Sequence, residues 1–201
     1  MEDLAALFNA FYTRFVLRDL LAKITPGTIV LVAISTIFIW QPENVAHYLA
    51  GLTFWAWTIL LAFSWITGIT IQSIGEWLEK RKEGWGIRYY PKDEFDDNHK
   101  EWFKFLVAFS HSDRVTDADK KRAERYAVIK EACGIGSIAF LIVSSLLAVK
   151  IVFLLVVSVY DTMGILLIGL IIAIIFTFSL NRMNKEHVQR HYDYMLAVID
   201  C

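Results

Sequence analysis

The sequence predicts an all-α, polytopic membrane protein with four transmembrane helices and a helical cytoplasmic module between the second and third. Hydrophobic residues make up 56% of the 201 residues, more than is usual in a soluble domain, and the mean hydropathy is +0.46. The apolar residues gather in two pairs of long segments, separated by the polar stretch 76–130. That stretch holds 13 of the 20 Lys and Arg residues, although the formal net charge is only -1. Charge segregation therefore carries the information about topology.

The first 25 residues are expected to form an amphipathic helix at the membrane interface. Its apolar positions recur at helical spacing and would make one face: Leu4, Leu7, Phe8, Phe11 and Phe15. Arg14 and Arg18 interrupt the apolar run, and a central Arg costs ~2.5–3.5 kcal/mol in a spanning helix. An interfacial position avoids that cost. The sequence Thr25-Pro26-Gly27 is expected to end this helix.

Residues 26–75 are predicted to form the first transmembrane hairpin. The apolar run at about 26–40 is short, because ~30 Å of hydrocarbon needs ~20 helical residues. The second run, 49–74, is longer, and Trp55, Trp57 and Trp77 near its ends are typical of interfacial aromatic belts.

Small or mildly polar residues recur at i, i+4 spacing in the second and fourth apolar segments. Such residues let helices approach closely in lipid, and Gln can hydrogen-bond between helices. They are predicted to mark helix packing or oligomerisation faces, and the bundle of the chain itself is the simpler partner for them. The residues are Ser64, Gly68 and Gln72 in one segment, and Gly169, Ala173 and Thr177 in the other.

Residues 76–130 are predicted to form the cytoplasmic helical module. A helix is expected over 98–109, with Trp102, Phe105, Leu106 and Phe109 on one face. Thr116 followed by Asp119 is typical of a capping box at the start of the next helix. That helix is expected to continue directly into the third apolar segment.

Residues 131–180 are predicted to form the second transmembrane hairpin, and 181–201 a cytoplasmic amphipathic tail. Lys150 would lie in the outer part of the third span, as an interface charge or a pore charge. The arm, the module and the tail hold 19 of the 20 basic residues, and the loops within the hairpins hold none. The positive-inside rule therefore places both termini and the module in the cytoplasm. The expected location is a bacterial inner membrane.

The sequence assigns no catalytic residue, no cofactor and no metal site. His187 and His191 would share a helix face and could ligate a metal, but the sequence offers no third ligand. Arg182 and His187 have Arg-x4-His spacing, which resembles the RNase motif of HEPN domains, where the pair acts on a scissile phosphate. Acidic neighbours dilute the basic residues of 120–130, so direct nucleic-acid binding is not expected.

In span count, size and charged cytoplasmic segment, together with the Arg182 and His187 spacing, the chain resembles small four-span membrane proteins of prokaryotic antiphage systems. These include accessory proteins beside some RNA-targeting CRISPR nucleases and the membrane component of the Kiwa system. The resemblance implies a protein that oligomerises and alters membrane permeability, or that recruits a soluble effector.

The main hypothesis is an oligomeric scaffold or pore-like effector that couples a cytoplasmic protein partner to the lipid bilayer. The first alternative is a small transporter, channel or membrane enzyme that uses Lys150 and the pair His187 and His191. The second alternative is a membrane-tethered nuclease that uses Arg182 and His187. Whether the chain is an enzyme is left open. If binding of a partner is relayed into the membrane, we expect the relay at the junction 126–136.

Overall fold

The computed structural model describes residues 17–38, 50–81, 87–95, 99–157 and 162–200. Within these ranges the chain is all-α, as predicted, and no strand occurs. The apolar face predicted for 1–25 falls mostly outside the described residues, and so do the loops that join the two helices of each predicted hairpin.

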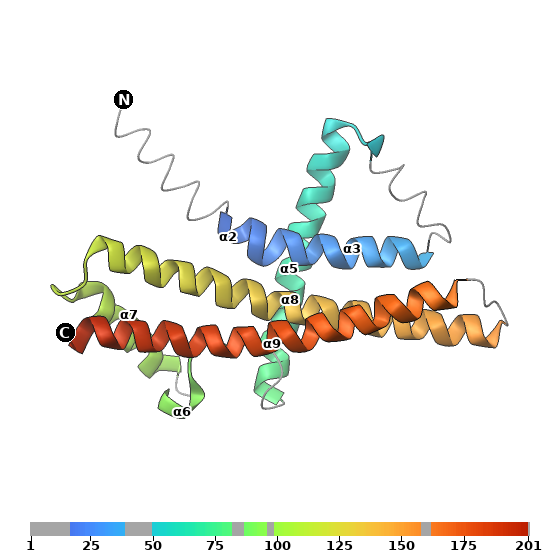
Figure 1. The fold of residues 1–201 in the computed structure, drawn as a ribbon. Coiled ribbons are helices and arrows are strands. Elements are labelled where there is room, and N and C mark those ends of the chain that lie inside the picture. Colours follow the sequence, from blue (N-terminus) through green and yellow to red (C-terminus); the bar gives the residue numbers. More distant parts are fainter. Residues whose placement is uncertain (1–16, 39–49, 82–86, 96–98, 158–161, 201) are drawn as a thin grey trace.

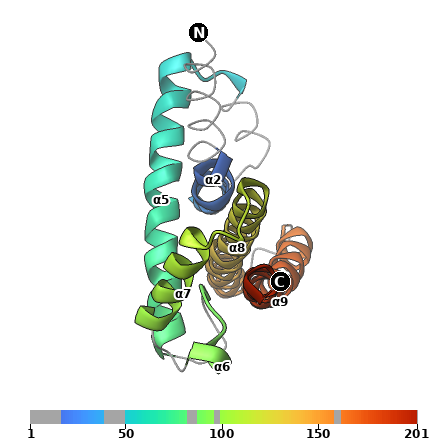
Figure 2. The same cartoon turned by 90° about the vertical axis from the view of Figure 1, so that its left-hand side faces the viewer.

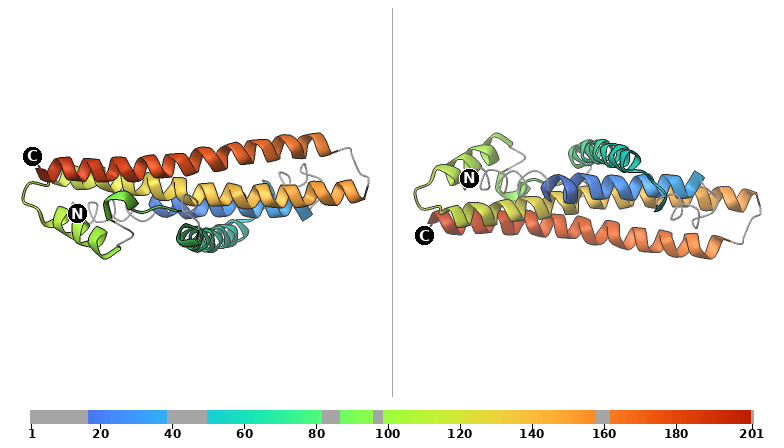
Figure 3. Two further views of the ribbon diagram at one scale, coloured as in Figure 1. Left: turned by 90° about the horizontal axis from the view of Figure 1, so that it is seen from below. Right: turned by 90° about the horizontal axis from the view of Figure 1, so that it is seen from above.

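Two long antiparallel helices run the length of the molecule (Figures 1 and 3). They are α8 (Asp117–Val156, 40 residues) and α9 (Met163–Asp200, 38 residues). The predicted capping box is confirmed, because Thr116 Oγ1 accepts from the Asp119 amide and the Asp119 carboxylate accepts from the Thr116 amide. Each helix contains both a charged and an apolar half without interruption. At ~1.5 Å per residue, α8 is about 60 Å long.

The N-terminal helical segment lies beside α8 and α5. It consists of α2 (Leu17–Asp19), a π-helical turn η2 (Leu20–Ile24) and α3 (Thr25–Phe38). The predicted end at Thr25-Pro26-Gly27 is wrong, since the helix continues through it. The π-turn ends at Ile24, two residues before Pro26. The ring nitrogen of Pro26 cannot donate to an i−4 carbonyl. The wider π-turn accommodates this missing hydrogen bond, and the helix continues.

Helix α5 (Phe54–Arg81, 28 residues) crosses α3 and α8 instead of lying alongside them (Figures 1 and 2). Two glycines make the crossing possible, because a Cβ on Gly27 would overlap the Ser64 carbonyl and a Cβ on Gly68 would overlap the Lys23 carbonyl. The helix backbones therefore touch at this point. Buried residues of η2, α3, α5, α8 and α9, together with Ile87, form an apolar core cluster.

Among the described residues, three helices are long and apolar enough to cross a membrane: Phe54–Lys80, Asp117–Val156 and Met163–Asp200. The predicted first span corresponds to a shorter apolar helix, Leu20–Ser35. At most 33% of the most apolar 18-residue stretch of each long helix is buried inside the molecule, so most of that stretch is left to face its surroundings. Helix length and composition therefore support a multi-pass membrane protein.

The charged halves of α8 and α9 contribute to a second hydrophobic core. The short helices α6 (Lys92–Phe95) and α7 (His99–His111) pack on them, and the helix predicted over 98–109 is confirmed as α7. Its predicted apolar face points into this core, where Trp102 and Phe109 are buried and Phe105 and Leu106 are partly buried.

Candidate functional site

A buried lysine lies where the charged half of α8 meets its apolar half. Lys130 is 5% exposed, and the apolar stretch of α8 begins two residues after it. Its Nζ donates to the Tyr89 carbonyl at 2.6 Å and lies 3.1 Å from His191 Nδ1. It also lies 5.2 Å from the centre of the Trp102 ring, a cation–π contact. One ammonium group thus holds together α7, α9 and the segment 87–91.

The surroundings of Lys130 and His191 determine their protonation. Burial lowers the pKa of Lys130 to about 8, against the attraction of Glu131. Burial, followed by repulsion from the Lys130 charge, lowers the pKa of His191 to about 3. His191 is therefore neutral near pH 7, and its Nδ1 accepts from the ammonium while Nε2 carries the hydrogen.

Asn184 of α9 is hydrogen-bonded to α8 and to the segment 87–91, close to Lys130. It is fully buried, and its Nδ2 donates to the Lys130 carbonyl at 2.6 Å. The same amide pairs with the backbone of Arg88: Oδ1 accepts from the Arg88 amide at 3.0 Å, and Nδ2 donates to the Arg88 carbonyl at 3.3 Å. Asn184 consequently fastens α9 to α8 and to the segment that follows α5.

Two ion pairs flank this network. Arg18 binds the buried Glu131 carboxylate through Nε at 2.8 Å and Nη2 at 2.7 Å. Arg88 Nε binds Glu79 Oε1 at 3.1 Å. The N-terminal helical segment and α5 are therefore tied by charge to α8 and to the segment 87–91.

A hydrogen-bonded triad between α5 and Tyr89 of the segment 87–91 completes the network. Tyr89 Oη donates to Glu76 Oε1 at 2.8 Å, and Gln72 Nε2 donates to both of them. Burial, followed by the hydrogen bond to Glu76, raises the pKa of Tyr89. Because Tyr89 also offers its carbonyl to Lys130, the triad connects α5 to the lysine.

We call this network the junction; it comprises Arg18, Gln72, Glu76, Glu79, Arg88, Tyr89, Trp102, Lys130, Glu131, Asn184 and His191. An amine of lowered pKa beside an imidazole occurs both in active sites and in structural networks. Here Trp102 covers the amine, whose donors are directed to protein groups. The arrangement is suited to fastening helices to one another.

The two histidines proposed for metal binding both lie beside the ring of Tyr126, with centroid distances of 6.4 Å for His187 and 6.3 Å for His191. His191 in addition lies 3.1 Å from the Lys130 ammonium through its Nδ1. No cluster of three metal-binding side chains occurs among the residues described. Arg182, the proposed catalytic partner of His187, is bound to Glu186, and the Arg182 side chain is 82% exposed.

The small-residue faces pack within the chain itself. Ser64 Oγ lies 3.0 Å from Thr28 Oγ1, Gly68 touches the Lys23 backbone, and Gln72 belongs to the junction. On α9, Ala173 and Thr177 are each 3% exposed, and Gly169 approaches Leu147. Lys150 is half-buried in the last two turns of α8.

The chain matches no known family model, no characterised protein and no solved structure. Sequence reasoning placed the expected relay at 126–136, which contains Lys130 and Glu131. It missed Tyr89 and Asn184, whose sequence signal is limited to polar side chains near the ends of apolar runs.

We expect acid to destabilise the protein through His191. A buried base whose pKa is lowered contributes stability above its unfolded value of about 6.5, and this is lost as the pH falls toward 3. At ~1.4 kcal/mol per pH unit, the loss between pH 6.5 and 5 is about 2 kcal/mol. Urea unfolding in detergent micelles would measure it. His191→Gln should remove this part of the pH slope, and an unchanged slope would contradict the assignment.

Proposed function

We propose that the protein is a membrane scaffold that couples a cytoplasmic helical module to its membrane-embedded helices. The main support for this proposal is that α8 and α9 each continue without a break from the charged half into the apolar half. The junction lies at this transition and joins them to α5, α7 and the N-terminal helical segment. A change in the packing of the module would therefore alter the packing of the apolar helices.

The surface of the module supports a protein partner in the cytoplasm. On α7, Phe103 is 66% exposed and Val107 is 41% exposed, one turn apart and opposite the buried face. Exposed aromatic residues are common anchors in protein interfaces. Lys104 lies on the same exposed face, which favours an acidic partner. Trp102, the neighbour of Phe103, covers Lys130 and would carry the effect of binding to the junction.

Orientation and assembly belong to the same proposal. The distribution of basic residues supports an orientation in which the module and both termini are cytoplasmic. Oligomerisation or pore formation would use the apolar faces of α5 and α9, where Phe63 is 59% and Ile168 is 61% exposed. The small-residue faces support it less, since the chain uses them internally. The resemblance in plan to antiphage membrane proteins extends the proposal to a defence role.

Inserting Gly-Gly after Lys130 tests the coupling. Two added residues rotate the halves of α8 by about 200° relative to each other, so the junction cannot close. Hydrogen exchange in lipid nanodiscs should then accelerate both in α7 and in 134–143. The control is Gly-Gly inserted after Asp113, in the connection between α7 and α8, where α8 stays intact. Equal exchange in the two variants would refute coupling through the junction.

A further inference from the structure

The side chain of Ile87 lies between two helices. Ile87 belongs to the segment 87–91, which follows α5, and it is 1% exposed. A Cβ added to Gly75 of α5 would come within 2.6 Å of Ile87 Cδ1. A Cβ added to Gly134 of α8 would come within 2.9 Å of Ile87 Cγ2. Both helices therefore have a glycine where they meet this side chain, because a larger residue at either position would displace it.

Main-chain hydrogen bonds hold Ile87 at this depth. Its amide donates to the Gly75 carbonyl at 3.3 Å. The next two residues are bound to the junction, since Asn184 pairs with the main chain of Arg88 and the carbonyl of the following residue accepts from Lys130. The segment 87–91 is thus fastened to α5, α8 and α9 through its backbone, and its position determines where the Ile87 side chain lies.

The segment 87–91 also reaches into the core of the module. Tyr90 is 6% exposed, and its ring packs against those of Phe95 and Trp102, with centroid distances of 6.4 Å and 6.3 Å. Trp102 belongs to α7, whose exposed face is the proposed contact for a cytoplasmic partner. A shift of α7 would therefore be transmitted to Tyr90 and, three residues earlier, to Ile87.

The helices α5 and α8 are already in contact beside Ile87. Ile138, one turn after Gly134, has its Cγ1 atom 3.1 Å from the position of a Cβ on Gly75. Helices with ordinary side chains between them lie ~8–10 Å apart, whereas facing glycines allow a closer approach. Ile87 therefore keeps the two glycines apart, and a small movement would bring them together once this side chain is withdrawn.

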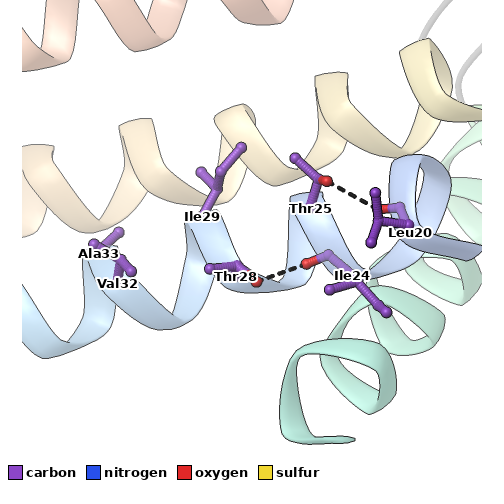
Figure 4. Close-up of a pocket in the computed structure, with 7 residues that line it drawn as sticks. All are labelled: Leu20, Ile24, Thr25, Thr28, Ile29, Val32 and Ala33. Carbon is purple, nitrogen blue, oxygen red and sulfur yellow. Dashed lines mark hydrogen bonds between the residues drawn. The ribbon is translucent and has the colours of Figure 1, made fainter. Parts of the chain in front are cut away.

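The crossing with the N-terminal helical segment fixes the other part of α5. There Gly27 and Gly68 bring the backbones into contact. Ser64 Oγ lies 3.0 Å from Thr28 Oγ1, which also donates to the Ile24 carbonyl at 2.8 Å (Figure 4). Beyond Gly68, α5 extends about 20 Å to its C-terminal end. This end of the helix is the part that can approach α8.

We propose that Ile87 is a spacer that keeps α5 apart from α8, and that withdrawal of the segment 87–91 lets the C-terminal end of α5 close on α8. The spacing of two apolar helices then depends on the position of the module. The inference rests on the proposed function for the source of the movement, because a partner on α7 would have to displace Tyr90. The spacer itself can be tested without a partner.

Double electron–electron resonance in lipid nanodiscs tests the proposal. Nitroxide labels are attached through ketone-bearing residues at positions 80 and 145, which are exposed on α5 and α8, so that Cys133 stays in place. Ile87→Ala removes most of the spacer, and the distance between the labels should shorten by about 2 Å, the size of helix shifts in protein switches. The matched control Ile87→Leu keeps the volume and should leave the distance unchanged. A second label pair, at positions 125 and 189 on α8 and α9, should keep its distance in every variant.

Gly134→Ala tests the spacer in the opposite direction and remains informative if Ile87→Ala does not fold. Its methyl group meets Ile87 Cγ2, so the distance between positions 80 and 145 should lengthen by about 1 Å. The double variant should return close to the wild-type distance. An unchanged distance in either single variant, or a shorter one in Gly134→Ala, would overturn the proposal. If exchange still accelerates in both halves after the Gly-Gly insertion, coupling through the junction stands without the spacer.

Discussion

Replacing Asn184 with leucine should lower the free energy of unfolding by about 3 kcal/mol, because a fully buried amide would be lost. Leucine has a similar volume but cannot pair with the Arg88 backbone or with the Lys130 carbonyl. A buried donor left without a partner costs ~1–3 kcal/mol, and the Arg88 amide would be such a donor. Chemical unfolding in detergent micelles would measure the change.

The matched control for Asn184 is Gln189→Leu. Gln189 lies on the exposed face of the same helix, where it bonds to Asp193 one turn later. Its replacement should change stability by less than about 0.5 kcal/mol. Exchange of the Arg88 amide should increase only in the Asn184 variant. If both variants were equally stable, Asn184 would not fasten the junction.

Replacing Gly27 with alanine should destabilise the crossing of α3 and α5 by about 3 kcal/mol, at the upper end for overpacking. The added methyl group meets the Ser64 carbonyl, which is backbone and cannot rotate away as a side chain would. The helices must therefore move apart, and the Thr28–Ser64 contact beside the crossing should break. Thermal unfolding, with a cysteine cross-link between α3 and α5 as a proximity probe, would detect both effects.

Gly164→Ala is the control for the crossing. Gly164 lies in the first turn of α9 and has open space around it. Alanine there should be neutral or stabilising by about 0.5–1 kcal/mol, because glycine is the poorer helix former. A Gly27 variant as stable as the Gly164 variant would show that the backbones do not touch.

Local features were predictable because their causes are local. The capping box of Thr116 and Asp119 needs only residues three apart, and the buried face of α7 follows from the 3.6-residue period. The apolar segments were equally visible from composition.

The crossing of α5 was not predictable from the pattern of apolar residues, which is the same for a parallel bundle and for crossed helices. The choice depends on Gly27 and Gly68 meeting distant carbonyls. The continuation through Pro26 depended on a π-turn that local propensity does not favour.

The position of the junction was predictable, whereas its partners were not. The stretch 126–136 was predicted to be the relay because the helix of the module continues there into the third apolar segment. Lys130, however, is held by a backbone carbonyl 41 residues away and a histidine 61 residues away. Pairing of side chains with distant backbone atoms leaves no periodic signal in a sequence.

The uninterrupted α8 gives the molecule a lever arm. About 37 Å of it, from Ala132 to Val156, is apolar, and about 20 Å, from Asp117 to Lys130, is charged. If the apolar part tilts by about 5°, the far end of the charged part moves by roughly 2 Å, which is the size of the helix shifts that switch protein interfaces. A small change in bilayer thickness that tilts the apolar part would therefore displace the tip of the module.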